Sequence, residues 1–140
     1  PGRWFTELAS PPNGEIQENL SLDRRLGAIG DSAVVEALGL GAMQISSAPE
    51  QLKVFKSVLP VNYQARSDFL KMDNHYDFNK ATPKIGIAIR SINNFESGPL
   101  VALGIIDRTG DLGRIGGGIY DPPLKLFKSA IDALDQSHEY

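Results

Sequence analysis

The spacing of hydrophobic residues divides the chain into segments expected to form strands and segments expected to form helices. Isoleucines alternate with Gly86 and Ala88 through residues 85–89, which is the period of two typical of a strand. An unbroken apolar run over residues 100–106 predicts a second, buried strand. Residues 2–9, which contain two large aromatic residues, predict a third strand, and the prolines and Asn-Gly pair of residues 10–14 end it.

Apolar residues at helical spacing predict helices elsewhere. A capping residue precedes residues 33–43, which have the composition of a buried helix made of small residues. Within it, Gly39 and Gly41 indicate close-packing positions or a helix end, because a glycine costs about 1 kcal/mol in a helix interior. Residues 49–59 and residues 63–72 predict two further helices, each with apolar residues on one face.

The connections and the last helix complete the predicted fold. Residues 15–29 are expected to form a loop, and residues 91–99 are expected to join two strands through a helical turn. Pro122 and Pro123 begin a final helix whose apolar residues recur at helical spacing. The sequence therefore predicts an α+β fold, with a mixed sheet and a few packed helices in a single compact domain.

Composition narrows the classes of partner. The net charge of −3, with lysine and arginine scattered along the chain, argues against a nucleic-acid partner, because no basic stripe is available to neutralise phosphates. No apolar run approaches the ~20 residues of a membrane helix, and no signal peptide begins the sequence, so no membrane partner is expected. The absence of cysteine excludes disulfides and thiolate metal sites and fits the cytoplasm, the expected location.

A glycine-rich segment, residues 107–120, follows the strand over residues 100–106. Its glycines remove the side chains that would keep a ligand away from peptide N–H groups, and two arginines stand beside them, so the segment is suited to a carboxylate or a phosphate. The alternative is a tight turn followed by a strand packed closely against a neighbour. The pattern matches neither the dinucleotide-binding fingerprint nor the phosphate-binding loop of nucleotide hydrolases, and no cofactor is expected.

Two other segments contain candidate chemical sites. Asp31 and Ser32 stand before a predicted helix, where the N-terminal dipole attracts an anion, although either residue is also an ordinary helix cap. Ser32 lies in no nucleophile-elbow motif, so a covalent role is not expected. Asp73, His75 and Asp77 alternate as metal ligands on a strand would, but the sequence offers no thiolate and only a tail histidine to complete a closed site. We therefore predict no metal site there.

The candidate anion-binding residues combine the helix start with the glycine-rich segment. The arginines offer a positive charge, the glycines offer backbone amides unobstructed by a side chain, and the other two residues stand at the start of a predicted helix. The set consists of Asp31, Ser32, Arg108, Gly113, Arg114, Gly116, Gly117 and Gly118. The expected ligand is a small anionic substrate or phosphate; no catalytic residue is assigned.

Several segments in order resemble the YlbE-like family of bacterial proteins. They are Arg3-Trp4-Phe5-Thr6, Gly30-Asp31-Ser32-Ala33, Ala48-Pro49, Gly86-Ile87 before Arg90, and Gly104-Ile105 through Gly113-Arg114-Ile115-Gly116-Gly117-Gly118 to Pro123 and Phe127. The resemblance covers most of the chain and corresponds to the C-terminal portion of longer family members. Because the chain also begins at Pro1 without a methionine, residues 1–140 are expected to be the C-terminal domain of a longer polypeptide.

The resemblance implies a role in nitrogen catabolism. Family members are encoded beside FdrA-type proteins, which resemble an acyl-CoA synthetase subunit, and one such set is linked to oxamate carbamoyltransferase in allantoin breakdown. That reaction moves a carbamoyl group between oxalurate and phosphate. The resemblance thus implies an anion-binding domain in a carbamoyl- or acyl-transfer complex with an FdrA-type partner subunit.

The alternative is a non-catalytic assembly domain. In that interpretation the small residues Gly39, Gly41, Gly86 and Ala88 form faces that pack against another subunit or a second copy of the chain. A shared open cleft between residues 30–32 and residues 108–118 would favour the anion site, whereas two separate and buried segments would favour assembly.

Overall fold

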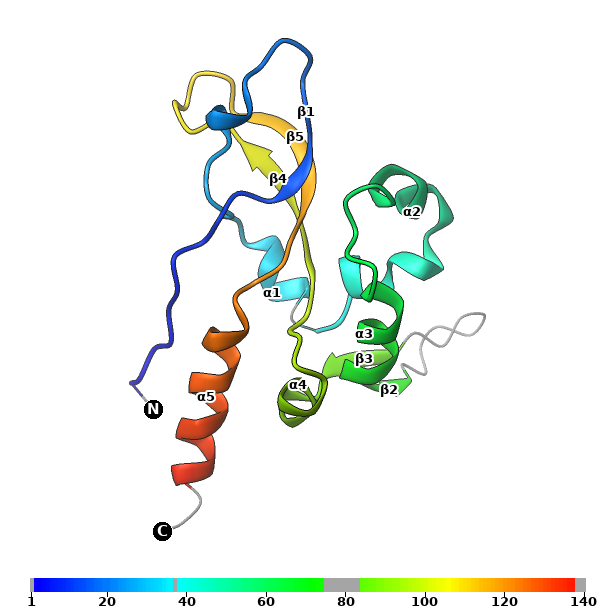
Figure 1. The fold of residues 1–140 in the computed structure, drawn as a ribbon, viewed down its shortest axis with the longest axis vertical. Coiled ribbons are helices and arrows are strands. Elements are labelled where there is room, and N and C mark those ends of the chain that lie inside the picture. The colour runs from blue at the N-terminus through cyan, green and yellow to red at the C-terminus, as the bar shows by residue number, and fades with distance from the viewer. Residues whose placement is uncertain (1, 37, 75–83, 138–140) are drawn as a thin grey trace.

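The computed structural model describes residues 2–36, 38–74 and 84–137 and has an α+β fold (Figure 1). Strands and helices alternate irregularly along the chain. In order they are β1 (Asn13–Ile16), the 3₁₀ helix η1 (Leu22–Arg24), α1 (Ser32–Glu36), the 3₁₀ helix η2 (Gly41–Ser47), α2 (Pro49–Phe55), α3 (Tyr63–Leu70), β2 (Lys71–Asn74), β3 (Lys84–Ile87), α4 (Ile89–Phe95), β4 (Val101–Ile106), β5 (Arg114–Tyr120) and α5 (Leu124–Ser137).

The larger sheet is antiparallel, with β5 between β1 and β4. At its centre Gly117 lies opposite Gly104 on one side and opposite Glu15 on the other. Since residues directly opposite each other share a face, these three residues mark one face of the sheet. Leu103, which neighbours Gly104 along β4, points to the other face. A separate pair, β2 and β3, is also antiparallel.

The expected strand over residues 100–106 is confirmed by β4, but the glycine-rich loop is shorter than expected. Residues 114–120 form β5, so only residues 107–113 connect the two strands. The structure thus has the alternative arrangement, a turn followed by a strand packed closely against its neighbours. Strand β5 carries glycines in place of bulky residues because β1 and β5 approach closely. A Cβ atom on Gly116 would overlap the carbonyl oxygen of Glu15, and a Cβ atom on Gly118 would lie 2.7 Å from the carbonyl oxygen of Asn13.

The core lies where the helices meet the lower ends of β4 and β5 (Figure 1). Its buried residues come from elements distributed along the whole chain: Ala42, Met43, Leu70, Ile92, Leu100, Ile119 and Ile131. The helix expected over residues 63–72 is confirmed as α3, and the final helix is confirmed as α5. The helix expected over residues 49–59 is shorter, because α2 ends at Phe55.

The small-residue helix expected over residues 33–43 is interrupted. Helix α1 ends at Glu36, and η2 begins at Gly41. Gly39 and Gly41 take φ angles of +81° and +63°, which other residues rarely adopt, so Gly39 lies in a turn and Gly41 begins η2. A Cβ atom on Gly39 would touch the side chains of Lys71 and Ile87 at 3.3 and 3.4 Å. This small residue therefore packs within the chain.

The strand expected over residues 2–9 is wrong, and the loop expected over residues 15–29 begins with part of β1. The N-terminal segment is extended but pairs with no described strand. It runs beside α5, where Glu7 forms an ion pair with Lys125 at 3.0 Å. Trp4 and Leu8 remain 88% and 94% exposed. Aromatic content alone thus gave the wrong prediction, because no described neighbouring strand satisfies this backbone.

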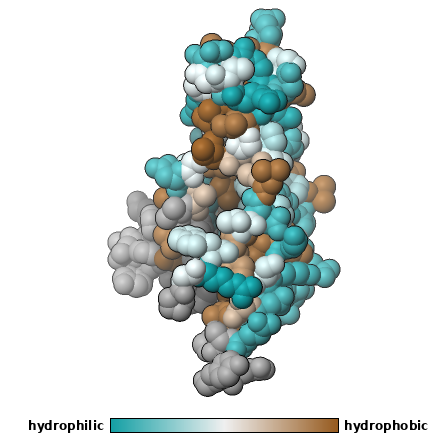
Figure 2. Space-filling model, turned by 90° about the vertical axis from the view of Figure 1, so that its left-hand side faces the viewer, coloured by the Kyte–Doolittle hydropathy of each residue, from teal (hydrophilic) through white to brown (hydrophobic). Residues whose placement is uncertain are grey.

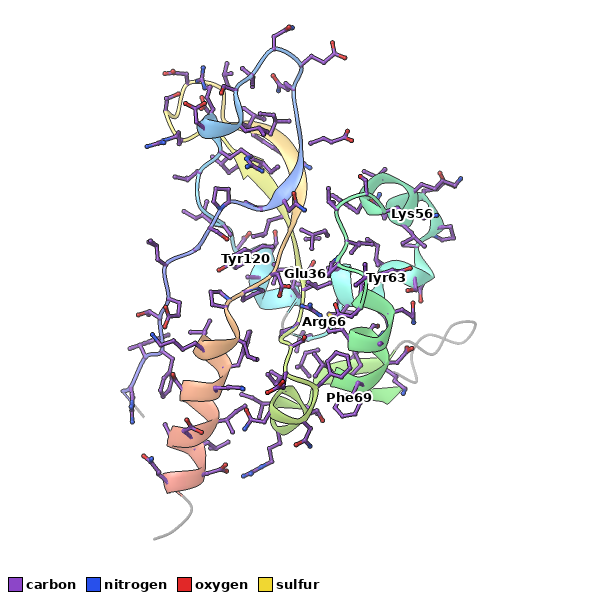
Figure 3. All side chains as sticks on the ribbon, viewed as in Figure 1. Glu36, Lys56, Tyr63, Arg66, Phe69 and Tyr120 are labelled. Atoms are coloured by element: carbon purple, nitrogen blue, oxygen red, sulfur yellow. The ribbon has the colours of Figure 1, made fainter. Side chains whose placement is uncertain are left out.

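A buried arginine fastens the helical part to the end of the sheet. Arg66 on α3 is 4% exposed and points into the interior between α3 and β4 (Figure 3). Its guanidinium donates to both carboxylate oxygens of Asp121, at 2.7 and 3.2 Å, to the carbonyl of Gly98 at 3.2 Å and to Asn62 Oδ1 at 3.1 Å. Helix α3 is thereby tied to both the segment before β4 and the segment after β5.

Candidate functional site

The candidate site is a cleft between the larger sheet and α2. It has a volume of about 230 Å³ and is lined by Glu15, Gln51, Val54, Phe55, Val58, Arg114 and Gly117. Strands β1 and β5 supply its polar wall and floor, and α2 supplies most of its apolar wall. Among the predicted anion-binding residues, Arg114 and Gly117 line this cleft.

Arg114 lies across the two central glycines of the sheet. Its Nε atom would be 3.2 Å from a Cβ on Gly104, and its Nη2 atom would be 3.4 Å from a Cβ on Gly117. The Nε–H group donates to the carbonyl of Gly116 at 3.0 Å. In the described part of the chain the guanidinium forms no ion pair, so its Nη groups are available to an anion.

The helix start predicted as a second anion-binding segment lies on the opposite face of the sheet. A Cβ on Gly30 would lie 3.6 Å from Leu103 Cδ2, whereas Arg114 covers the neighbouring residue, Gly104. Since adjacent strand residues point to opposite faces, Gly30 and Arg114 lie on opposite sides. Gly30 and Ala33 border a separate cavity of about 250 Å³ with mainly apolar residues around it. Asp31 and Ser32, both exposed, therefore do not share a cleft with Arg114.

The remaining predicted residues also lie outside the cleft. Arg108 is exposed near the start of the β4–β5 connection, and its Nη1 donates to the Asp23 carbonyl at 3.4 Å. Gly113, with a φ of +64°, accepts a hydrogen bond from the Asp107 amide at 2.8 Å. Gly116 and Gly118 lie in the central strand, whose amides point toward the neighbouring strands. The anion-binding role of these residues stays a prediction.

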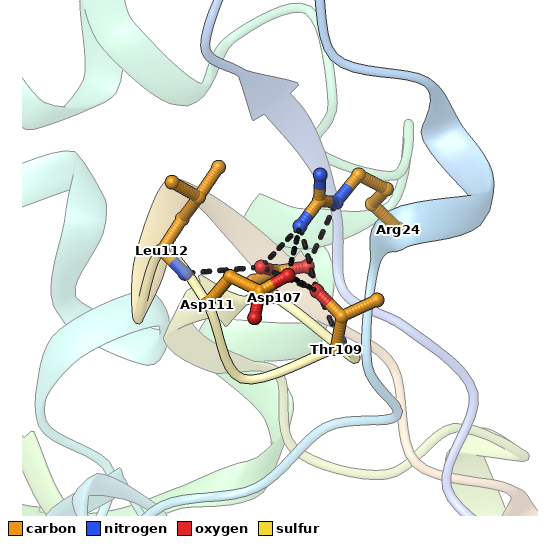
Figure 4. Close-up of polar contacts among 5 residues, drawn as sticks. All are labelled: Arg24, Asp107, Thr109, Asp111 and Leu112. Atoms are coloured by element: carbon orange, nitrogen blue, oxygen red, sulfur yellow. Dashed lines mark hydrogen bonds and ion pairs between the residues drawn. The ribbon is translucent and has the colours of Figure 1, made fainter.

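A second polar cluster occupies the β4–β5 connection and was not predicted (Figure 4). The Asp107 side chain is fully buried. Arg24 donates to it twice, from Nε to Oδ1 at 3.0 Å and from Nη2 to Oδ2 at 2.6 Å. Thr109 Oγ1 and the Leu112 amide donate to Oδ2 at 2.9 and 3.1 Å. These donors satisfy the carboxylate within the protein, so the cluster fixes the hairpin end to η1.

The pKa values of two buried carboxyl groups are shifted in opposite directions. The Arg24 guanidinium and the hydrogen bonds of Thr109 and Leu112 hold the pKa of Asp107 well below its usual range. Glu36 is 5% exposed and lies at the junction of α1 with β4 (Figure 3). Burial raises its pKa, although hydrogen bonds from the backbone amides of Ala42, at 2.8 Å, and Ala102 oppose the increase.

We expect Glu36→Gln to change the pH dependence of stability. A carboxyl group whose pKa is raised by folding binds its proton more tightly in the folded state, so its contribution to stability is lost as pH rises above the ordinary carboxyl range. The glutamine variant should lack this fall in the free energy of unfolding with rising pH. Urea unfolding at about pH 5 and about pH 7.5 measures it, with the exposed Glu18→Gln as control. An unchanged pH slope in Glu36→Gln would contradict the assignment.

Comparisons with known proteins bear on the function of the cleft. The chain is 28% identical over 146 residues to the oxamate carbamoyltransferase subunit AllG of Escherichia coli (strain K12), a match that covers 96% of this chain and 34% of that protein. It resembles a carbamoyltransferase subunit. It is also 26% identical over 143 residues to the uncharacterized protein YahG of the same organism, covering 94% of this chain and 29% of that protein. The chain thus spans about a third of the length of these relatives.

A solved structure shows the same fold. The crystal structure of a conserved protein of unknown function from Enterococcus faecalis V583 superposes with a TM-score of 0.76 at 23% identity, over 96% of this chain and 34% of that one. No protein-family model matches the sequence. The α+β arrangement is therefore shared with a known protein.

The described residues add two observations on other classes of site. None of their helices is both long and apolar enough to cross a membrane. No three histidine, aspartate or glutamate side chains gather as metal ligands within residues 2–36, 38–74 and 84–137. His75 and Asp77, two of the three residues weighed as metal ligands, lie outside the described residues, and the structure describes only the backbone of Asp73.

Proposed function

We propose that this chain is an anion-binding domain of a YlbE-like subunit in a carbamoyl- or acyl-transfer complex, with Arg114 as the residue that holds the anion. The similarity to a subunit of oxamate carbamoyltransferase supports the assignment to such a complex. In this proposal the domain belongs to a longer cytoplasmic protein of oxalurate or allantoin catabolism, and an FdrA-type subunit is its partner.

The observation that carries the proposal is the placement of Arg114. Two glycines in register, Gly104 and Gly117, leave the sheet surface beneath the guanidinium without side chains. A side chain at Gly104 would crowd the guanidinium, since its Cβ atom would lie 3.2 Å from Arg114 Nε. Arg114 lines a cleft in which no described residue forms an ion pair with it, and a guanidinium with both Nη groups unpaired matches the oxygens of a carboxylate or phosphate.

Arg114 would act by holding and neutralising the substrate. A charged nucleophile approaches an anionic substrate more easily once the negative charge of that substrate is balanced, and a fixed orientation removes part of the entropic cost of reaction. The described part of the chain shows no nucleophile paired with a general base at this cleft. The reacting groups are therefore assigned to other parts of the complex.

Arg114→Gln should weaken binding without unfolding the protein. We expect the free energy of unfolding to change by at most about 0.5 kcal/mol, as for ordinary surface substitutions. Phosphate or carboxylate binding should weaken by roughly 1.5–3 kcal/mol, the scale of a charge-assisted hydrogen bond. A thermal melt and an anion titration on the same variant of the full-length protein measure both.

The matched control for Arg114→Gln is Arg90→Gln, which removes the same charge from an exposed position outside the cleft. It should leave anion binding nearly unchanged. Because Arg114 also bonds the Gly116 carbonyl, a purely structural role is the competing explanation. Loss of stability in Arg114→Gln with unchanged anion affinity would establish that role and reject the proposed site.

The purified 140-residue chain is expected to show no transferase turnover. The cleft contains the Arg114 guanidinium, which in this proposal binds and orients an anion. The described residues supply no nucleophile paired with a base there. An assay of phosphate-dependent oxalurate cleavage, run on the chain alone and on the full-length protein with its neighbouring gene products, tests this. Turnover by the chain alone would overturn the assignment of the reacting groups to other parts of the complex.

A non-catalytic assembly domain is the second candidate. The observation that favours it is the exposure of large hydrophobic residues such as Trp4, Leu8 and Val61, and hydrophobic side chains are exposed on the face shown in Figure 2. The small residues first considered for such a face are less available, since Gly39 and Gly86 pack near each other within the chain. Binding of an FdrA-type subunit that is lost in Trp4→Ser but kept in Arg114→Gln would support this candidate.

A further inference from the structure

Glu15 shares the cleft with Arg114 but does not pair with it. Both residues line the same cavity of about 230 Å³, and Glu15 lies directly across from Gly117, the glycine that Arg114 covers. Their charged atoms nevertheless form no ion pair, and in the described part of the chain the Glu15 carboxylate accepts no side-chain hydrogen bond. Two opposite charges thus border one small space without neutralising each other.

The rest of the cleft restricts the size of what fits between these charges. Phe55 closes it from α2, with its ring 3.7 Å from where a Cβ on Gly117 would lie. Val54 and Val58 extend this apolar wall, and Gln51 adds one neutral amide. The volume lies below the range of about 300–1,000 Å³ typical of drug-sized ligands. A short molecule that spans the two charges is favoured over a large one.

We infer that Glu15 is a specificity-determining residue, which makes the cleft select a small carboxylate carrying an N–H donor over a dianion. The inference rests on the proposed function, because Arg114 has to hold the anionic end. The Glu15 carboxylate then accepts a hydrogen bond from an amide or similar N–H group at the other end. A second negative charge in that position meets Glu15 at close range and is repelled. Phosphate, which carries more than one negative charge near neutral pH, is disfavoured for the same reason.

Succinamate and succinate are suitable probes, because they differ by the replacement of one carboxylate by a carboxamide of the same shape. Titration calorimetry on the full-length protein should show succinamate binding at least 5-fold more tightly than succinate, with inorganic phosphate weaker than succinamate. Glu15→Gln should bring the ratio of the two affinities close to one, mainly by strengthening succinate. Glu18→Gln, an exposed acidic residue that does not line the cleft, should leave the ratio unchanged.

The outcomes separate this inference from the proposed function. Equal binding of succinamate and succinate by the natural protein, lost in Arg114→Gln, would overturn the role of Glu15 and keep the anion site. Binding that does not depend on Arg114 would overturn the proposed site and the inference with it. A preference for succinamate that persists in Glu15→Gln would assign the selectivity to another residue and reject Glu15.

Discussion

Gly116→Ala is expected to destabilise the protein by about 3 kcal/mol or more, a large part of the 5–15 kcal/mol that holds a typical domain folded. The added methyl group would overlap the carbonyl oxygen of Glu15 in the adjacent strand. A flexible side chain moves aside at small cost, but a strand backbone moves only if the pairing of β1 with β5 is disturbed. Denaturant unfolding followed by circular dichroism measures the loss.

The next residue provides a matched control for Gly116→Ala. A methyl group on Gly117 points into the cleft and meets Arg114 and Phe55 at ordinary contact distances of 3.4 and 3.7 Å. Gly117→Ala should therefore change stability by less than about 1 kcal/mol, partly because alanine loses less backbone entropy than glycine on folding. Equal destabilisation by the two substitutions would contradict the close approach of β1 to Gly116.

Asp107→Asn is expected to lower the melting temperature by roughly 5–10 °C. The substitution removes the negative charge from a fully buried side chain and turns one accepting oxygen into a donor that faces other donors. Arg24 then loses its bidentate partner. Asp111→Asn is the control, since its carboxylate is 73% exposed and lies 3.5 Å from the same guanidinium; its melting temperature should hardly move.

The acid side of the stability profile provides a second readout for Asp107. Folding lowers the pKa of this carboxyl group, so its contribution is present above the ordinary aspartate pKa and is lost as pH falls below it. The natural protein should therefore lose stability in acid more steeply than Asp107→Asn. Parallel profiles for the two proteins would show that the carboxylate is not held as described.

Local hydrophobic patterns were sufficient to predict the strands and helices whose own residues show the spacing of that element. Strand β4 is an apolar run, and α3 and α5 have helical spacing; each required no knowledge of distant residues. Strand β1 was missed because it is short, follows two prolines and pairs with a glycine-rich partner a hundred residues away. Because the strand it pairs with is remote in sequence, hydrophobic periodicity carries no signal for β1.

Only the part of the candidate site that is local in sequence was predicted. Arg114 and its glycine neighbours are close in sequence, and their types indicate an anion. Glu15 and Phe55 reach the cleft from separate elements, and Arg24 reaches Asp107 across 83 positions. Nothing in the type or spacing of these residues signals such pairings, which arise from the register of β1 on β5, the position of α2 beside Gly117 and the path of η1.

The pairing of β1 with β5 also sets an order of events during synthesis. Strands β4 and β5 are joined by seven residues, 107–113, so they can pair as soon as both have left the ribosome. Strand β1 is made first, yet its partners run from Gly116 to Ile119, so it has to wait, unpaired, through almost the entire translation of this chain. Closing so long a loop is slow because of its entropic cost. The Glu15–Arg114 cleft is therefore among the last features of the molecule to form.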